Sequence, residues 1–171
     1  MRHRYVTKEA FRIVGLMKRV PIVFHGINPG IAELSAELTP EMIEELKQLS
    51  NTDPQGIISA SVNFSLGRME ERGELDHYIG VATTSETTGD YAVLEVEAGE
   101  WVIFDVIGPF PQTVQKVWGD IYSKWLPSTD FEPTGGPEIL WNETADMDDP
   151  KYRSQIWIPV RKKTGTGRWY A

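Results

Sequence analysis

The sequence predicts an α+β fold in which helices pack against antiparallel sheet. Three observations predict it. The element order strand, helix, strand, strand occurs twice along the 171 residues, each helical segment has one apolar stripe, and the strands are short runs between turn residues. We expect one domain over residues 1–171, divided into two βαββ halves at about 5–88 and 89–163.

The strands of the first half are indicated by β-branched runs. Residues 10–20 mix such side chains with Gly15 and stop before Pro21, which disfavours continuation of regular structure. The glycine- and proline-containing stretch 26–30 is interpreted as a loop. Residues 57–66 and 77–84 flank a polar, glycine-containing tip and are predicted to form a hairpin.

The first helix is predicted over residues 39–51. Thr39 is a suitable N-cap, Pro40 suits the first helical position, and acidic residues follow in the first turn. Its apolar face consists of Met42, Ile43, Leu46 and Leu49.

The second half repeats this order. Strands are predicted over 92–96 and 100–108, and a last hairpin over 137–142 and 154–160, with an acidic loop between its strands. The intervening segment 109–127 is the clearest amphipathic helix in the chain. Its stripe has helical spacing and consists of Val114, Val117, Trp118, Ile121, Tyr122 and Trp125.

Composition excludes several classes of function. The chain has no cysteine, so disulfides and thiolate chemistry are excluded. Its three histidines lack metal-ligand spacing, and we predict no metal and no cofactor. The net charge of −8 argues against nucleic-acid binding by this chain. Without a long apolar run or a signal peptide, a cytoplasmic protein away from membranes is expected.

One carboxylate stands at the head of an apolar strand. Alternation puts Glu138 and Leu140 on one face of the predicted strand and Ile139 and Trp141 on the other. A carboxylate in apolar surroundings either pairs with a cation or has its pKa raised by desolvation. The alternative interpretation is a solvent-exposed glutamate at a strand end, after a Gly-Gly-Pro turn.

The facing strand carries a side-chain amide and an aromatic ring. Gln155 and Trp157 share a face, and hairpin pairing is predicted to bring that face beside Glu138. The amide can donate to a carboxylate or to a ligand without adding charge. A polar edge residue facing water, and a core tryptophan, are the alternatives.

Several phrases resemble the GyrI-like small-molecule-binding domain, the effector domain of AraC- and MerR-type multidrug regulators. They are FRIVGL at 11–16, HYIGV at 77–81, EAGEWVIFDVIGP at 97–109, VWGDIYSKWLP at 117–127, and the pair PEILWN and SQIWIPV. The similarity runs over residues 5–163.

This resemblance implies two halves related by a pseudo-twofold, with a central groove that binds flat, apolar and often cationic molecules. It implies that Glu138 faces the groove. Leu140 and Gln155 depart from the aromatic and the acid that members often carry at these places. The predicted ligand-binding residues are Glu138, Leu140, Gln155, Trp157, Tyr78, Trp101, Phe104, Phe110, Trp118 and Trp141.

The resemblance implies two kinds of function. The first is a stand-alone protein that senses or sequesters drug-like molecules; a regulator would need a separate DNA-binding partner. The alternative is a hydrolase that opens the cyclopropane rings of DNA-alkylating natural products, with Glu138 as acid or base and Tyr78 as its hydroxyl partner. A related haem-binding type is disfavoured because no histidine is suitably placed as an axial ligand. The sequence predicts no oligomeric state.

Overall fold

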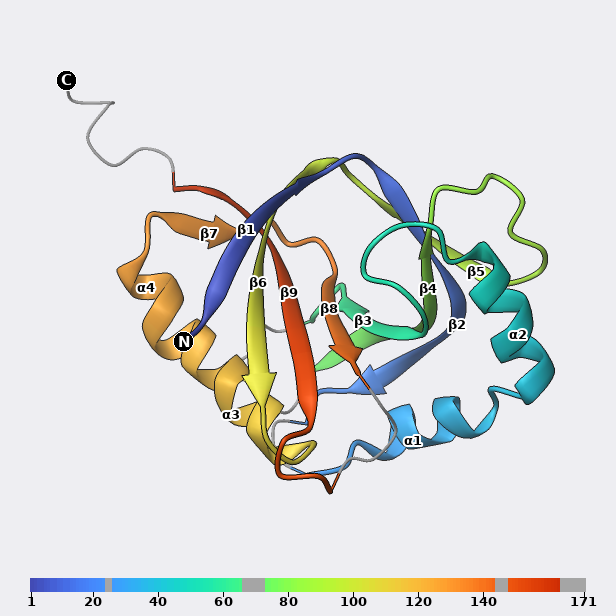
Figure 1. Ribbon diagram of the computed structural model, residues 1–171, viewed down its shortest axis with the longest axis horizontal. Helices are drawn as coiled ribbons and strands as arrows, with labels where there is room; N and C mark the ends of the chain where they lie inside the picture. The colour runs from blue at the N-terminus through green and yellow to red at the C-terminus, as the bar shows by residue number, and fades with distance from the viewer. Residues whose placement is uncertain (24–25, 66–72, 144–147, 164–171) are drawn as a thin grey trace.

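The computed structural model describes residues 1–23, 26–65, 73–143 and 148–163. Nine strands in this part of the chain form one antiparallel sheet, in the order β1-β6-β9-β8-β3-β4-β2-β5, and the short β7 also pairs with β9 (Figure 1). The elements are β1 His3–Lys8, β2 Phe11–Pro21, α1 Pro29–Ala36, α2 Pro40–Leu49, β3 Ile58–Val62, β4 Glu74–Thr83, β5 Ala92–Val96, β6 Gly99–Ile107, α3 Gln112–Asp120, η1 Ile121–Trp125, α4 Leu126–Ser128, β7 Phe131–Pro133, β8 Glu138–Asn142 and β9 Arg153–Lys162. The predicted α+β class is confirmed.

In this order β3, β4 and β2 of the first half lie side by side, and so do β6, β9 and β8 of the second half. β3 of the first half pairs with β8 of the second at the centre of the sheet. At the two ends, β1 pairs with β6 and β5 pairs with β2, so each half lends one edge strand to the other. The continuous ladder therefore makes the two halves one structural unit.

Three elements were not predicted from the sequence: β1, β7 and α1. The stretch 26–30 was interpreted as a loop, but α1 begins within it. The Asn28 side-chain oxygen caps this helix by accepting hydrogen bonds from the backbone N–H groups of Gly30 and Ile31, and Pro29 occupies the first helical position. Both are ordinary helix-start signals. The N-cap predicted at Thr39 is confirmed, because its hydroxyl accepts from Met42 N at 3.2 Å.

The long amphipathic helix of the second half is interrupted. It runs as α3, then as five residues of π-helix, η1, and ends as the single turn α4. π-Helical turns are rare and occur often at functional sites. Here the π-turn contains Tyr122. No helix in the described part of the chain is long and apolar enough to cross a membrane.

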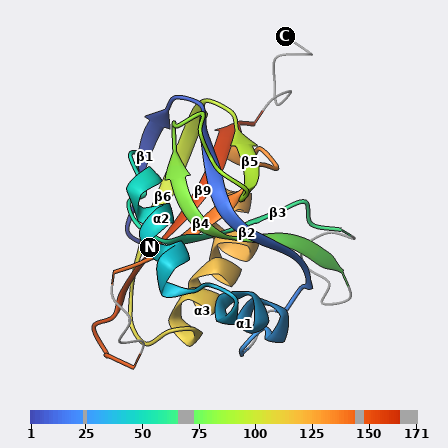
Figure 2. The ribbon, with the colours of Figure 1, turned by 90° about the vertical axis from the view of Figure 1, so that its right-hand side faces the viewer.

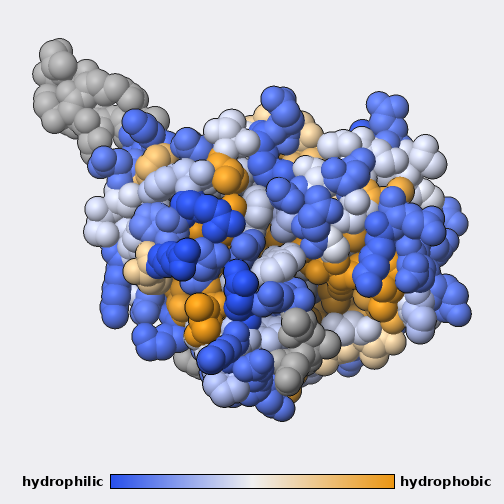
Figure 3. Space-filling model, viewed as in Figure 1, coloured by the Kyte–Doolittle hydropathy of each residue, from blue (hydrophilic) through white to orange (hydrophobic). Residues whose placement is uncertain are grey.

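The helices lie on one side of the sheet, which we call the helix face. α1 and α2 pack on β2 and β4, whereas α3 packs on β6 and β9. Figures 1 and 2 show α1–α2 and α3 on separate parts of the sheet. The other side, the opposite face, carries a core shared by both halves that includes Ile13, Trp101, Ile139 and Trp157. The side of the molecule seen in Figure 3 carries mostly hydrophilic side chains, with apolar patches between them.

Two paired glycines allow β2 and β4 to approach closely. Gly15 is opposite Gly80 in the register of these strands. A Cβ at Gly15 would lie 2.0 Å from the Ile79 carbonyl oxygen, and one at Gly80 would lie 1.9 Å from the Val14 carbonyl oxygen. Because both obstacles are backbone atoms, the ladder itself must shift to admit a methyl group.

We therefore expect Gly15→Ala and Gly80→Ala each to lower the free energy of unfolding by about 3 kcal/mol, as overpacking of a core does. Urea unfolding followed by circular dichroism measures this. The matched control is Gly119→Ala in α3, where the added Cβ meets nothing within 4 Å beyond the helix's own backbone, and helix propensity predicts a gain of up to about 1 kcal/mol. Equal stability of Gly15→Ala and wild type would contradict the prediction.

Candidate functional site

Glu138 begins β8, and its side chain lies on the helix face at the centre of the sheet. It is 5% exposed. One carboxylate oxygen accepts a hydrogen bond from Trp118 Nε1 at 2.7 Å, and the other accepts one from the Tyr122 hydroxyl. The predicted alternation of Glu138 with Ile139 is confirmed, and the alternative of a solvent-exposed glutamate is wrong.

Both donors come from the helix of the second half. Trp118 is in α3 and Tyr122 is four residues later, in η1, and side chains four apart share a helical face. Both rings are half-buried and pack on the core between α3 and the sheet. The aromatic stripe that the sequence indicated as packing on the sheet thus also orients the carboxylate.

The centre of the helix face is only partly covered. Ser59, Ser61 and Leu140 are half-buried here, although β3 and β8 are the middle strands of the sheet. On the opposite face of the same strands, Ala60 and Ile139 are almost fully buried. The helices thus leave a partly open strip, which we call the central strip, above β3 and β8.

His77 lies next to this strip, on β4. Its Nδ1 is 3.1 Å from Ser61 Oγ, and its Nε2 is buried without a hydrogen-bond partner. Burial lowers the pKa of the imidazole to about 4. Lys18, opposite His77 on β2, forms an ion pair with Glu33 of α1. His77 is therefore a neutral, incompletely satisfied polar group at pH 7.

One end of the strip is bridged by the chain that leads into α1. The Gln115 side chain of α3 accepts a hydrogen bond from Gly26 N at 3.2 Å and donates one to Gly26 O at 2.8 Å. These two bonds tie the helix of the second half to the first half. Within the described ranges, no group of three or more His, Asp or Glu is placed to hold a metal ion.

The ten residues predicted to bind ligand divide between the two faces. Glu138, Leu140 and Phe104 are on the helix face, and Trp118 and Phe110 pack with that side. Of these, Phe104 is fully buried under the helix. The opposite face carries Tyr78, Trp101, Trp141, Gln155 and Trp157.

Two predicted juxtapositions are wrong. Gln155 pairs with Trp141 and Trp157 with Ile139, so both side chains lie on the opposite face and not beside Glu138. Tyr78 pairs with Ala60 and also lies there. The hydroxyl partner of Glu138 is Tyr122. It lies four residues after Trp118 on the amphipathic stripe of the sequence, and this helical spacing is the signal that places the two side chains together.

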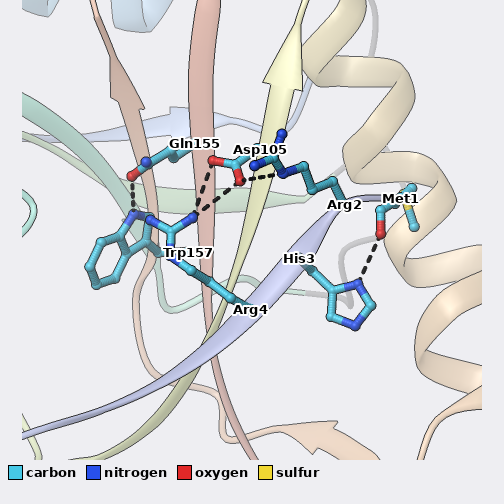
Figure 4. Close-up of polar contacts among 7 residues, drawn as sticks. All are labelled: Met1, Arg2, His3, Arg4, Asp105, Gln155 and Trp157. Carbon is cyan, nitrogen blue, oxygen red and sulfur yellow. Dashed lines mark hydrogen bonds and ion pairs between the residues drawn. The ribbon is translucent and has the colours of Figure 1, made fainter.

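Gln155 instead belongs to a polar cluster at one end of the opposite face (Figure 4). Its amide oxygen accepts a hydrogen bond from Trp157 Nε1 at 3.0 Å, and the neighbouring Asp105 accepts from Arg4. A depression of about 250 Å³ is found there, lined by Arg2, Arg4, Asp105, Val106, Ile107, Trp141, Arg153, Ser154 and Gln155. It is separated from Glu138 by the thickness of the sheet.

Residues 1–161 match the model of the GyrI-like small molecule binding domain. The match covers almost the whole chain. The chain therefore belongs to the GyrI-like small-molecule-binding family. A search of curated proteins finds no match.

Solved structures share the fold. SAV2435 bound to tetraphenylphosphonium has a TM-score of 0.70 and 19% identity, over 94% of both chains. A putative transcription regulation protein from Staphylococcus aureus MU50 has a TM-score of 0.65 and 20% identity, over 94% of this chain and 99% of that one. A more distant hydrolase from Listeria innocua has a TM-score of 0.51 and 11% identity, over 94% and 92%.

The buried His77 makes stability depend on pH. Its pKa is about 4 in the folded protein and about 6.5 in an unfolded chain. As the pH falls below 6.5, the unfolded chain takes up a proton that the folded chain does not. The free energy of unfolding therefore falls, by about 3 kcal/mol at pH 4.

Urea unfolding of wild type and His77→Gln between pH 7 and pH 4 measures this contribution. We expect the difference in unfolding free energy between the two proteins to change by about 3 kcal/mol over this range. His3→Gln, at an exposed histidine, serves as the control and is expected to follow wild type. Parallel curves for wild type and His77→Gln would contradict the prediction, because they would show that His77 takes up no additional proton when the protein unfolds.

Proposed function

We propose that this protein binds aromatic, cationic small molecules at the central strip, with Glu138 as the anionic contact. The observation that carries the proposal is the buried carboxylate of Glu138, which Trp118 and Tyr122 orient by hydrogen bonds. The residues of the central strip beside it are only half-buried. A carboxylate in this position is costly to bury, and a binding role accounts for that cost.

The surroundings suit a flat cation with delocalised charge. A carboxylate attracts a cation more strongly where water is excluded. The rings of Trp118 and Tyr122 and the side chain of Leu140 supply apolar contact. A weakly hydrated organic cation loses less on leaving water than a small ammonium ion, which favours drug-like cations over metal ions or amines.

Family membership and one neighbour support this assignment. The family is one of small-molecule-binding domains, and SAV2435 was solved with tetraphenylphosphonium, an aromatic cation. We transfer that ligand class to this chain as part of the proposal. The protein would then sense or sequester drug-like molecules in the cytoplasm, and its acidic net charge of −8 disfavours direct binding of nucleic acid.

Isothermal titration with tetraphenylphosphonium tests the proposal. We expect Glu138→Gln to weaken binding by about 10- to 100-fold, because the amide keeps the shape but loses the charge that compensates the cation. Triphenylphosphine oxide, a neutral compound with similar rings, should bind both proteins equally weakly. Glu143→Gln, an exposed carboxylate just after β8, is the control. Unchanged affinity in Glu138→Gln would refute the assignment of the site.

A second candidate function is hydrolysis of a strained cyclopropane. The contact between the Tyr122 hydroxyl and Glu138 favours it, because a paired acid and base is what this reaction requires. Glu138 would take a proton from water as the water oxygen attacks a ring carbon. The electron pair of the breaking carbon–carbon bond would take a proton from the Tyr122 hydroxyl, and Glu138 would return its proton to the Tyr122 oxygen, which completes the addition of one water molecule.

Incubation with a cyclopropane-containing DNA alkylator, followed by mass spectrometry, distinguishes the two candidates. An enzyme yields the ring-opened water adduct, and this turnover is lost in Glu138→Gln and strongly reduced in Tyr122→Phe. A binding protein leaves the alkylator intact, although it binds tetraphenylphosphonium in the titration above. Turnover that persists in Glu138→Gln would exclude this carboxylate from the reaction.

A further inference from the structure

Polar side chains form a row across three adjacent strands of the helix face. Glu138 on β8 is the register partner of Ser61 on β3, and Ser61 is the register partner of His77 on β4. Register partners in neighbouring strands point to the same face. The row therefore continues from Glu138 into the first half of the molecule, along the floor of the central strip.

His77 is the polar group of this row that the protein does not satisfy. It is 5% exposed, and Nε2 is the buried side-chain nitrogen or oxygen that has no hydrogen-bond partner within the described ranges. An unsatisfied buried polar atom costs about 1–3 kcal/mol. Such atoms are rare in folded proteins, so each one requires an explanation.

The orientation of the ring directs this nitrogen away from the sheet. Strand side chains stand roughly perpendicular to the sheet, and Nδ1 is turned sideways to Ser61. Nε2 is the distal nitrogen of the imidazole, so it faces the layer that contains the helices and the central strip. The neighbouring Ser59 and Ser61 are half-buried, and the strip beside His77 is thus partly open.

Ion pairing does not account for His77. Among the residues that the structure describes, the charged groups that face it are Lys18 on β2, which is paired with Glu33 of α1, and Glu138, two strands away, which accepts hydrogen bonds from the helix of the second half. The Ser61 hydroxyl is able either to donate to Nδ1 or to accept from it. Nε2 is correspondingly available as an acceptor or as a donor, because the imidazole is neutral.

We propose that His77 is a specificity-determining residue of the ligand site, whose Nε2 hydrogen-bonds a hydroxyl, amine or carbonyl group of the bound cation. This inference rests on the proposed function of Glu138. Adjacent strands are about 4.8 Å apart, so the two polar anchors are separated by about 10 Å. The preferred ligand is an aromatic cation with a polar substituent at the far end of one ring.

Two phosphonium ions test this inference. Tetraphenylphosphonium has no hydrogen-bonding group, whereas (4-hydroxyphenyl)triphenylphosphonium has the same charge and one additional para hydroxyl. We expect wild type to bind the hydroxylated ion about tenfold more tightly, the value of one buried hydrogen bond. In His77→Phe this preference should disappear, with the affinity for tetraphenylphosphonium nearly unchanged.

The same titrations separate this inference from the assignment of Glu138. Glu138→Gln should weaken binding of both ions and leave their ratio unchanged. Equal affinity of wild type for the two ions, or a preference that survives in His77→Phe, would overturn the role of His77 alone. Failure of wild type to bind either ion would overturn the proposed function, and this inference with it.

A measurement on wild type keeps the test independent of whether His77→Phe folds. In protein labelled with ¹⁵N at histidine, the Nε2 resonance of His77 should shift on addition of the hydroxylated ion and much less on addition of tetraphenylphosphonium. Identical changes with both ions would show that the hydroxyl does not contact His77. His77→Gln, which retains hydrogen-bonding capacity, should recover part of the preference lost in His77→Phe.

Discussion

The pairing of β3 with β8 is the interaction on which the molecule depends. Three residue pairs, Ser59 with Leu140, Ala60 with Ile139 and Ser61 with Glu138, join the two halves at the centre of the sheet. The helices of each half cover that half's own outer strands. The central pair is consequently left between the two groups of helices, and its helix face is only partly covered.

This arrangement explains why polar side chains are tolerated in the middle of the sheet. On the opposite face the same strands contribute Ala60 and Ile139 to a core shared by both halves, and hydrophobic burial there holds the ladder together. The helix face can then carry Ser61, His77 and Glu138. Hydrogen bonds from α3 and η1 offset the cost of burying Glu138, and the contact between Ser61 and His77 Nδ1 offsets part of the cost of burying the imidazole. Among these three side chains, His77 Nε2 is the buried nitrogen left without a partner.

The sequence was informative where a pattern is local. Alternation within 137–142 separated Glu138 from Ile139 correctly, and the helical spacing of 114–125 put Trp118 and Tyr122 on one stripe. Asn28, the N-cap of α1, is also a local signal, but the glycines and proline around it are equally typical of a turn. β1 was missed because its pairing partner, β6, is almost one hundred residues away.

Non-local relations within the site were predicted less well. Gln155 and Trp157 share a face, as alternation requires, but they lie on the opposite face, whereas Glu138 lies on the helix face. A change of register by one residue between β8 and β9 would reverse this result, and nothing within either strand specifies that register. Tyr78 was misassigned for the same reason, since its face depends on how β4 pairs with β3.

The sequence by itself thus determined the α+β class, most of the strands and helices, and the position of a carboxylate in an apolar strand, because these follow from spacing along the chain. Only the tertiary structure decided which tyrosine contacts Glu138, that Ser61 and His77 continue its row, and that α3 and the chain before α1 meet through Gln115 and Gly26. Those relations join residues that are distant in sequence, and packing and strand register, not local preference, bring them together.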